Sequence, residues 1–414
     1  MKEKILLLTL ISLFVSPGLA DAYGLSSAQA MAMGGAFTGL AKGVYAPLYN
    51  PANIGLSEYR QFGLEIAGVG VEISNNSFTL DDYNNYTGAI LTDEDKSIIL
   101  GKIPDEGLKI KADIEASALS LSLGRFVVSI NGFAATETNL GKDALELFLQ
   151  GNGLNDTFSL DGMFSEAVAY ASAGLSYGLP VYQTGNRQLS VGLTAKYIRG
   201  FGYEKVTELR GGVVTLVTGF QGEGTMIAQT ATGGSGYAVD LGAALRISND
   251  YTAGICIKNF LSSITWDQDT EEHGYHFQFD TMTVDNWDDS IVVSDDYSVV
   301  IPSFRSTLPS IMKLGIANTS GKLLWAVDWE QGFRQAAGAS TKPRLSFGAQ
   351  YQLVSLLPVR AGYAAGGGRG PVLSGGLGFN LTVFYLDVAV SNHSGFNFSE
   401  SKGLHFGLST GLRF

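Results

Sequence analysis

The feature that most constrains this chain is a two-residue alternation of apolar with polar or small side chains, clearest at its carboxyl end. Between Gly403 and Phe414, one face carries Leu404, Phe406, Leu408, Thr410, Leu412 and Phe414, and the other carries His405, Gly407, Ser409, Gly411 and Arg413. Successive side chains of a β-strand point to opposite faces. This segment therefore suits a sheet with lipid on one side and polar groups on the other, or the edge strand of a soluble sandwich.

The same alternation recurs along the chain and predicts about fourteen strands. They are centred on residues 62–73, 108–123, 126–130, 169–177, 189–197, 237–245, 253–257, 312–316, 323–329, 345–351, 357–363, 373–379, 384–391 and 404–414. In two of them the apolar parity switches, between Ile66 and Val69 and between Ile114 and Leu119, which predicts a bulge or kink. An even strand number puts both chain ends on one side, as in bacterial single-chain barrels.

The connections between these strands alternate in length. The short ones are 123–125, 248–250, 319–321 and the turn at Asn380, and the long ones are 76–107, 137–163, 203–234 and 266–308. Short turns on one side and long loops on the other are typical of a membrane barrel. We therefore expect an all-β fold, a transmembrane antiparallel β-barrel of about 14 strands over residues 61–414.

Charged residues fall on the polar faces of the predicted strands, where a barrel would turn them into its lumen. They are Lys196, Asp240, Arg246, Lys258, Lys313, Asp328, Glu330, Arg360, Asp387 and Arg413. In the lumen these groups can pair or meet water, whereas on the lipid face each would cost several kcal/mol near the midplane.

The start of the chain predicts export. Lys2 and Lys4 precede an apolar run of about eleven residues, and small residues follow up to Ala22. This pattern predicts a signal peptide over residues 1–22, because the apolar run is too short to span a bilayer as a helix.

Composition narrows the function further. Charged residues make up 16 % of the chain, against about 25 % in soluble globular domains, which fits a partly lipid-facing surface. The formal net charge of −12 argues against nucleic acid as a partner, because phosphate-binding surfaces need clustered Lys and Arg.

Residues 23–60 lack the strand pattern and have the size of an internal plug. Their first part is rich in small residues, and Pro47 and Pro51 then force turns. A barrel of fourteen strands is too wide for its own side chains to fill. We therefore expect residues 23–60 to form an N-terminal hatch.

The order Met-Gly-Gly-Ala at 33–36, Tyr-Asn-Pro-Ala-Asn-Ile-Gly-Leu at 49–56 and a closing strand that ends on Phe414 resembles a known group. It is similar to the outer-membrane long-chain fatty acid transporter (FadL- and TodX-like) family, including PorV-like relatives. The resemblance implies a plugged fourteen-stranded barrel whose hatch carries an Asn-Pro-Ala motif, here Asn50, Pro51 and Ala52.

The resemblance also implies a function and a location. The function is passive uptake of a hydrophobic small molecule, such as a long-chain fatty acid, without a cofactor. The location is the outer membrane of a Gram-negative-type bacterium, in contact with lipid and lipopolysaccharide, after insertion by the barrel assembly machinery through the C-terminal strand. PorV-like relatives work with a secretion system, so a non-transporting barrel that binds a protein partner is the first alternative.

Two groups of residues are candidate ligand contacts. Residues 141–152 read as a short loop helix on which Leu145, Phe148 and Leu149 share one face, with Gly151 as its stop. This face could meet an apolar ligand or pack the loop onto the barrel rim. Lys196, Arg246 and Lys258 could hold a carboxylate or form lumen ion pairs with Asp240 and Asp328.

An outer-membrane hydrolase is the second alternative. His393 and Ser394 are adjacent, so on a strand they point to opposite faces and cannot act as base and nucleophile. His273 and His276, with Glu271, Glu272 and Asp280, read as a solvated acidic loop, and Asp285, Asp288, Asp289, Asp295 and Asp296 match no calcium-loop pattern. We therefore assign no catalytic residue and no metal ligand from the sequence.

Overall fold

The computed structural model of the chain describes residues 24–57, 62–151, 153–283, 292–334, 336, 339–367, 370–393 and 397–414. The predicted signal peptide at 1–22 lies outside the described residues, as do Ser394 and the three aspartates at 285, 288 and 289. Among the described helices, none is long and apolar enough to cross a membrane.

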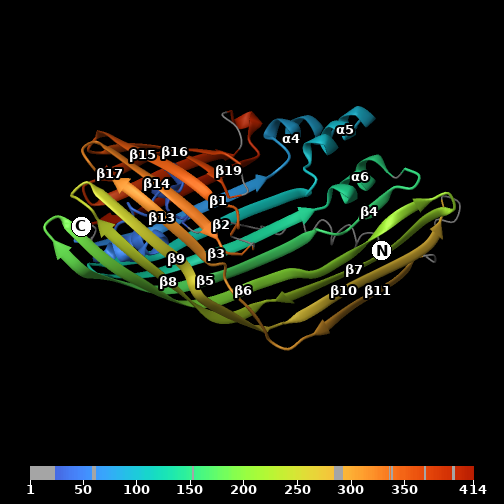
Figure 1. Cartoon of the computed structure of the whole chain (residues 1–414), viewed down its shortest axis with the longest axis horizontal. Coiled ribbons are helices and arrows are strands. Elements are labelled where there is room, and N and C mark those ends of the chain that lie inside the picture. Colours follow the sequence, from blue (N-terminus) through green and yellow to red (C-terminus); the bar gives the residue numbers. More distant parts are fainter. Residues whose placement is uncertain are drawn as a thin grey trace.

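Fourteen antiparallel strands close into a barrel (Figure 1). They are β1 (Phe62–Asn75), β2 (Leu108–Leu123), β3 (Phe126–Leu140), β5 (Phe164–Thr184), β6 (Arg187–Leu216), β8 (Gly233–Arg246), β9 (Tyr251–Gln268), β13 (Ile311–Asn318), β14 (Leu323–Gly332), β15 (Arg344–Val354), β16 (Leu357–Gly366), β17 (Val372–Leu381), β18 (Phe384–His393) and β19 (Gly403–Arg413). Each pairs with the next in this order, and β19 pairs with β1 to close the ring. The predicted fold class is confirmed.

Both predicted irregularities are bulges in the first two strands. The register of β1 against β19 shifts between Glu65 and Ala67, and that of β2 against β3 shifts between Ser117 and Leu119. An inserted residue reverses the side-chain parity beyond it, so each strand keeps its apolar residues toward the outside along its whole length. The turn predicted at Asn380 lies two residues later, at Thr382, which adopts a φ of +28°.

Two of the stretches that the sequence predicts as long loops are paired strands instead. The far half of β6 pairs with β7 (Gly219–Ala231), β7 with β10 (Glu271–Met282), and β10 with β11 (Val293–Val300). Figure 1 shows this outer sheet leaving the barrel on the side opposite the carboxyl terminus. The prediction of loops at 203–234 and 266–308 is therefore wrong. Both faces of these strands can meet water, so apolar and polar residues need not alternate along them. Their sequences therefore lack the two-residue period that identifies the barrel strands.

Shorter elements complete this end of the molecule. They are β4 (Thr157–Ser159), which pairs with β6; β12 (Phe304–Ser306), which pairs with β9; the helices α4 (Leu80–Tyr86), α5 (Asp93–Lys102) and α6 (Lys142–Gln150); and the 3₁₀ turn η3 (Phe398–Glu400). Figure 1 places α4, α5 and α6 on the same side of the barrel as the outer sheet. The helix expected within 141–152 is present as α6, and Gly151 ends it with a φ of +74°.

The first described segment folds inside the barrel. It contains α2 (Ala28–Ala32), η1 (Gly43–Tyr45), α3 (Ala46–Tyr49) and η2 (Pro51–Gly55). Apart from Gly35, Lys42, Leu48 and Ser57, every residue from 24 to 57 is buried. Gln188, near the β5–β6 turn, accepts from Ser57. The segment therefore fills the part of the lumen nearer the short turns, as Figure 1 shows by its blue coils within the wall.

The outer wall of the barrel is apolar, with aromatic residues at the end of the short turns. Exposed aromatic side chains at or near those strand ends are Phe62, Phe126, Tyr251, Tyr351, Phe384 and Phe414. A row of aromatic residues at one rim and aliphatic residues above it is the pattern that transmembrane barrels present to lipid.

Candidate functional site: the lumen and its inner segment

The Asn-Pro-Ala motif forms the turn by which the inner segment contacts the barrel wall. Asn50 caps η2: its Oδ1 accepts from the Ala52 backbone N at 3.0 Å, and its Nδ2 donates to the Ala243 carbonyl of β8 at 3.0 Å. Pro51 occupies the first position of η2, where its missing N–H removes no hydrogen bond. The geometry of this turn therefore explains why Asn and Pro stand at positions 50 and 51. The role of Asn50, Pro51 and Ala52 in a hatch stays a prediction.

The barrel wall has glycine where this turn comes close. A Cβ at Gly192 would overlap the backbone of Pro51 and Ala52, and one at Gly242 would overlap the Asn50 side chain. On the opposite wall, a Cβ at Gly362 would overlap the backbone of Met33. The segment therefore lies against the backbone of the strands, an approach that only glycine permits.

Acidic residues of the lumen hold the backbone of the segment. Glu115 accepts from the Leu25 backbone N at 2.8 Å and also from that of Gly24. Asp328 accepts from the backbone N of Phe37 at 2.9 Å and of Thr38 at 2.8 Å. These carboxylates come from β2 and β14, which face each other across the segment, so they tie it to distant parts of the wall.

A further acidic residue, Asp387 on β18, both holds the inner segment and forms an ion pair within the barrel wall. It accepts from Gln29 Nε2 of α2 at 2.7 Å and forms an ion pair with Arg360 at 2.6 Å. The sequence places Asp328, Arg360 and Asp387 in the lumen, but it gives no sign that they hold the inner segment. Glu115 was not singled out at all, although it lies on the polar face of a predicted strand.

Two of the three predicted carboxylate-binding residues lie together. Lys196 Nζ is 2.8 Å from Asp240 Oδ1, and Lys258 Nζ is 2.7 Å from Asp240 Oδ2. Lys258 also donates to the Pro47 carbonyl of the inner segment at 2.8 Å. Arg246 lies apart at the short-turn end, where its Nε donates to the Asn186 carbonyl at 3.0 Å. The ion pairs with Asp240 are present, and ligand contact by these residues stays a prediction.

The two lysines line a cavity with an aromatic wall, which we call the lysine cavity. Its other lining residues include Phe133, Tyr170 and Leu308. The rings of Phe133 and Tyr170 stack with their centroids 4.9 Å apart. The cavity therefore has a stacked aromatic pair from β3 and β5, beside the polar Ser129, Asn131 and Ser172 of the same strands, and a cationic side built from β6 and β9.

The apolar side continues as a larger cluster that reaches the inner segment. Tyr203 lies 5.2 Å from Trp266 and 5.3 Å from Phe304, centroid to centroid. Leu25 and Met31 of the inner segment belong to the same buried cluster as Phe133, Tyr170 and Trp266. A packed cluster of buried apolar side chains thus extends from Tyr203 and Trp266 to the inner segment.

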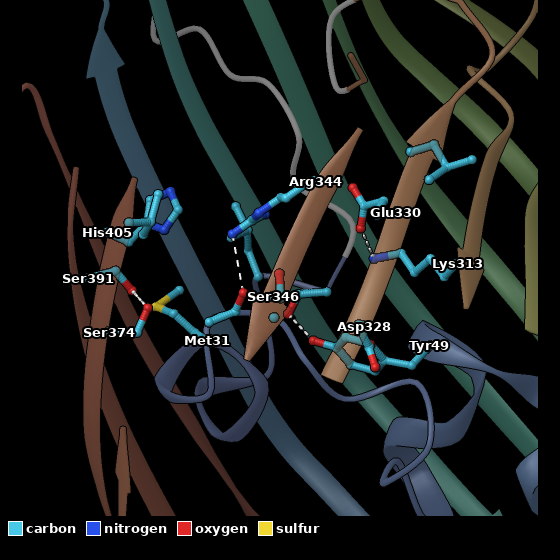
Figure 2. A pocket seen from close by; sticks show the side chains of 16 residues that line it. Met31, Tyr49, Lys313, Asp328, Glu330, Arg344, Ser346, Ser374, Ser391 and His405 are labelled. Carbon is cyan, nitrogen blue, oxygen red and sulfur yellow. Dashed lines mark hydrogen bonds and ion pairs between the residues drawn. The ribbon is translucent and has the colours of Figure 1, made fainter. Parts of the chain in front are cut away.

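A second cavity, which we call the arginine cavity, is polar (Figure 2). Lys313 and Glu330 form an ion pair of 2.6 Å on its wall. Arg344 Nη2 donates to the Gly34 carbonyl at 3.3 Å. Figure 2 shows Asp328 and Tyr49 on one side and His405 on the other. This charged lining does not suit an apolar ligand.

The predicted apolar face of α6 divides between two environments. Leu145 and Leu149 pack against a buried cluster that includes Leu100 and Ile103 from the end of α5. Phe148 is 85 % exposed. The helix therefore packs the β3–β5 connection onto the neighbouring one, and contact of these three residues with a ligand stays a prediction.

These features define a class: a closed fourteen-stranded antiparallel β-barrel with a helical segment in its lumen. The chain belongs to the family of unknown function DUF5723, whose model matches residues 51–388. No curated protein matches the sequence.

Solved structures share this fold at low sequence identity. The "TodX deltaS2S3 mutant monoaromatic hydrocarbon channel" is 14 % identical with a TM-score of 0.52, covering 95 % of this chain and 98 % of that one. The "TodX monoaromatic hydrocarbon channel deltaS2 mutant" is 13 % identical with a TM-score of 0.51, covering 94 % and 98 %. A FadL homologue from Pseudomonas aeruginosa is 12 % identical with a TM-score of 0.49, covering 96 % and 98 %. At such identity the two TodX structures establish the fold alone.

Proposed function

We propose that this protein is an outer-membrane channel that admits hydrophobic compounds, such as long-chain fatty acids, by diffusion. Residues 23–60 would act as its hatch. The fold is shared with two TodX monoaromatic hydrocarbon channel structures. The apolar outer wall suits the outer membrane of a Gram-negative-type bacterium, where lipid and lipopolysaccharide would surround the barrel and the assembly machinery would insert it.

The lysine cavity is the single observation that carries this proposal. Its stacked rings and Leu308 offer an apolar surface to a hydrocarbon chain, and its two ammonium groups share one carboxylate, Asp240. Glu115, also on the cavity wall, already accepts from the hatch backbone. A fatty acid carboxylate would supply a further anion for the two lysines, where charge-assisted hydrogen bonds are strong.

The same cavity connects a ligand to the hatch. Lys258 Nζ holds both Asp240 and the Pro47 carbonyl. A ligand carboxylate that draws Lys258 toward itself would weaken the bond to Pro47. Binding and hatch release would then compete for one ammonium group, which gives a physical route from ligand arrival to opening.

Uptake of radiolabelled oleate by a deletion strain carrying plasmid-borne variants tests the proposal. We expect Phe133→Gln to lower the initial rate about tenfold, because it removes an apolar contact worth about 1.5–3 kcal/mol. Phe398→Gln is the matched control, since Phe398 lies in η3 and is exposed. If the wild-type gene does not raise uptake above that of the deletion strain, the channel proposal fails. A non-transporting barrel that binds a protein partner is then the better explanation.

The role of the lysines has its own test. Lys196→Gln should reduce oleate uptake but leave toluene uptake unchanged, because toluene has no carboxylate. Gln retains a hydrogen-bonding side chain toward Asp240 and Asn259, both partners of Lys196. Equal losses for both compounds would show that Lys196 supports the barrel rather than the ligand.

A further inference from the structure

Three buried side chains from neighbouring strands converge in the lumen where the barrel closes. Glu72 lies on β1 and His405 on β19, and the two residues are register partners across the closing pair. His393 lies on β18, two residues beyond Ser391, which is the register partner of His405. Because side chains two residues apart share a face, both histidines and the glutamate point to the same side of the wall.

The contact atoms of the three side chains form a tight triangle. His393 Nε2 lies 3.3 Å from His405 Nε2 and 3.4 Å from Glu72 Oε1, and His405 Nε2 contacts Glu72 Oε2. One ligand atom from each residue lies within 4.8 Å of the others. Two atoms bound at about 2.05 Å to a tetrahedral Zn²⁺ would stand about 3.3 Å apart. The two separations involving His393 match that spacing.

Hydrogen bonds between the rings account for this arrangement less well than a cation does. Each ring can donate its Nε2–H to a different oxygen of Glu72, but the two Nε2 donors then stand only 3.3 Å apart. A metal ion would instead accept a lone pair from each ring and from the carboxylate at once. The side chains are 1 %, 4 % and 0 % exposed for His393, His405 and Glu72, so the three lie away from bulk solvent.

The charges around the triangle also favour a cation. Asp113 is the register partner of Glu72 on β2, and Glu137 forms an ion pair of 3.3 Å with Lys111 nearby. Arg344 and Lys111 act on Glu72 electrostatically. The carboxyl groups of Glu72, Asp113 and Glu137 therefore gather beside these two basic side chains, in surroundings that can accommodate a divalent ion.

We propose that Glu72, His393 and His405 bind a divalent transition metal ion, with Zn²⁺ as the best fit to two imidazoles and one carboxylate. Three protein ligands leave a fourth position of a tetrahedral ion open. His405 also lines the arginine cavity, beside Ser391 (Figure 2). Water from that polar cavity could complete the coordination.

The site joins the first strand of the barrel to its last two. A metal bound by β1, β18 and β19 clips the seam at which the two ends of the sheet meet. Since an ion that binds only the folded state raises stability with its concentration, Zn²⁺ should raise the temperature at which the barrel unfolds. This inference does not depend on the transport proposal.

Calorimetric titration of untagged, chelator-treated barrel in detergent with Zn²⁺ tests the site. We expect saturable binding of one ion per chain, a rise in unfolding temperature, and the absorption of a tetrahedral complex when Co²⁺ replaces Zn²⁺. His393→Gln and His405→Gln should each lower the affinity more than the roughly 10- to 100-fold that loss of an outer-shell partner costs. His273→Gln and His276→Gln, on β10 in the outer sheet, should leave it unchanged.

Folding of each variant is checked by the gel shift of the unheated barrel. If His405→Gln does not fold, the site can still be tested by the Zn²⁺ affinity of His393→Gln and by the effect of Zn²⁺ on the unfolding temperature of the wild type. Wild-type protein that neither binds Zn²⁺ nor gains stability from it would overturn the site. Folded His393→Gln protein that binds Zn²⁺ as tightly as the wild type would do the same.

Discussion

Glycine residues on the inner wall decide how close the inner segment can lie to the strands. Gly178, Gly192, Gly242 and Gly362 each leave room for backbone or side-chain atoms of the inner segment that a Cβ would overlap. Glycine weakens a strand, because it loses more conformational freedom on folding than other residues and has no side chain to pack. Part of the large glycine content, 53 residues, therefore serves close packing of the lumen rather than turns.

Gly192→Ala should displace the inner segment, because its Cβ would overlap the backbone at Pro51 and Ala52. Overpacking of this kind costs about 1–3 kcal/mol. We expect a lower unfolding temperature and a higher conductance in planar bilayers. Gly202→Ala is the matched control on the same strand, since nothing lies within 4 Å of its added Cβ. Equal conductance of the two variants would show that the turn at Asn50 does not occlude the lumen.

Asp82 gives the connection between β1 and β2 a dependence on pH. Burial opposes ionisation of its carboxyl group, but hydrogen bonds from Lys102 and Thr79 outweigh burial and lower the pKa of Asp82 below its ordinary value of 3.8. The folded state thus favours the ionised form. The resulting stability is present above the unfolded pKa and is lost as the pH falls through the lowered folded pKa.

Hydrogen exchange of α4, residues 80–86, at decreasing pH would show this loss. Protection should fall below about pH 4 by an amount equivalent to on the order of 1 kcal/mol or less, as expected for a partly exposed pair. Asp82→Asn should lower protection at neutral pH and remove the pH dependence, whereas Asp81→Asn, its exposed neighbour, should behave as the wild type. A wild-type profile that is flat down to pH 3 would contradict the argument.

Among the elements, the barrel strands could be predicted from the sequence because lipid imposes a pattern on them. All fourteen predicted strands correspond to barrel strands, and the parity switches mark the two bulges. The outer strands β7, β10 and β11 lie beyond the barrel, where both faces can be polar. Their pairing depends on neighbours distant in the chain, and no local pattern specifies it.

The starts of α4 and α5 can be recognised in the sequence. Thr79 with Asp82, and Thr92 with Asp95, form capping boxes at their starts, and a Thr followed by an acid three residues later is a helix-start signature. No comparable local sequence motif predicts which residues pair with the charged side chains of the lumen. Strand register around the closed ring sets which carboxylates reach the inner segment and which histidines meet.

The outer hairpin β10–β11 can be removed without opening the barrel. The Ile301 backbone N donates to the Thr270 carbonyl at 3.0 Å, so a short Gly-Ser linker can join these residues in place of 271–300. Neither strand takes part in the pairings that close the ring. We expect the shortened chain to keep its heat-modifiable gel shift and a cooperative unfolding transition.

Deletion of Val372–His393, which are β17 and β18, is the matched comparison. This change removes two strands from the ring and should abolish the gel shift. Loss of the shift in the β10–β11 deletion as well would mean that the outer sheet is needed for the barrel to form.

The whole molecule is divided into a lipid-facing band, a packed lumen and a wet outer end. Outward side chains in the middle of β17 and β18, such as Leu377 and Val388, are exposed apolar residues. The inward neighbour Asp387 is fully buried. The outer sheet and helices leave the barrel at the end with the long connections, and the short turns lie at the aromatic rim. This division predicts that a new charge is tolerated at the outer end and destabilises the protein in the lipid-facing band.

Leu377→Lys tests whether the apolar band lies in lipid. Leu377 lies mid-strand on β17 and is 54 % exposed, and a lysine near the bilayer midplane costs about 2–4 kcal/mol. Val217→Lys is the comparison, because Val217 is 85 % exposed in the β6–β7 turn, outside the barrel. In equilibrium refolding from urea into lipid vesicles, we expect the Leu377 variant to lose that amount of stability and the Val217 variant to lose almost none. Because an aqueous surface tolerates lysine at either position, equal stability of both variants would place the band in water rather than in lipid.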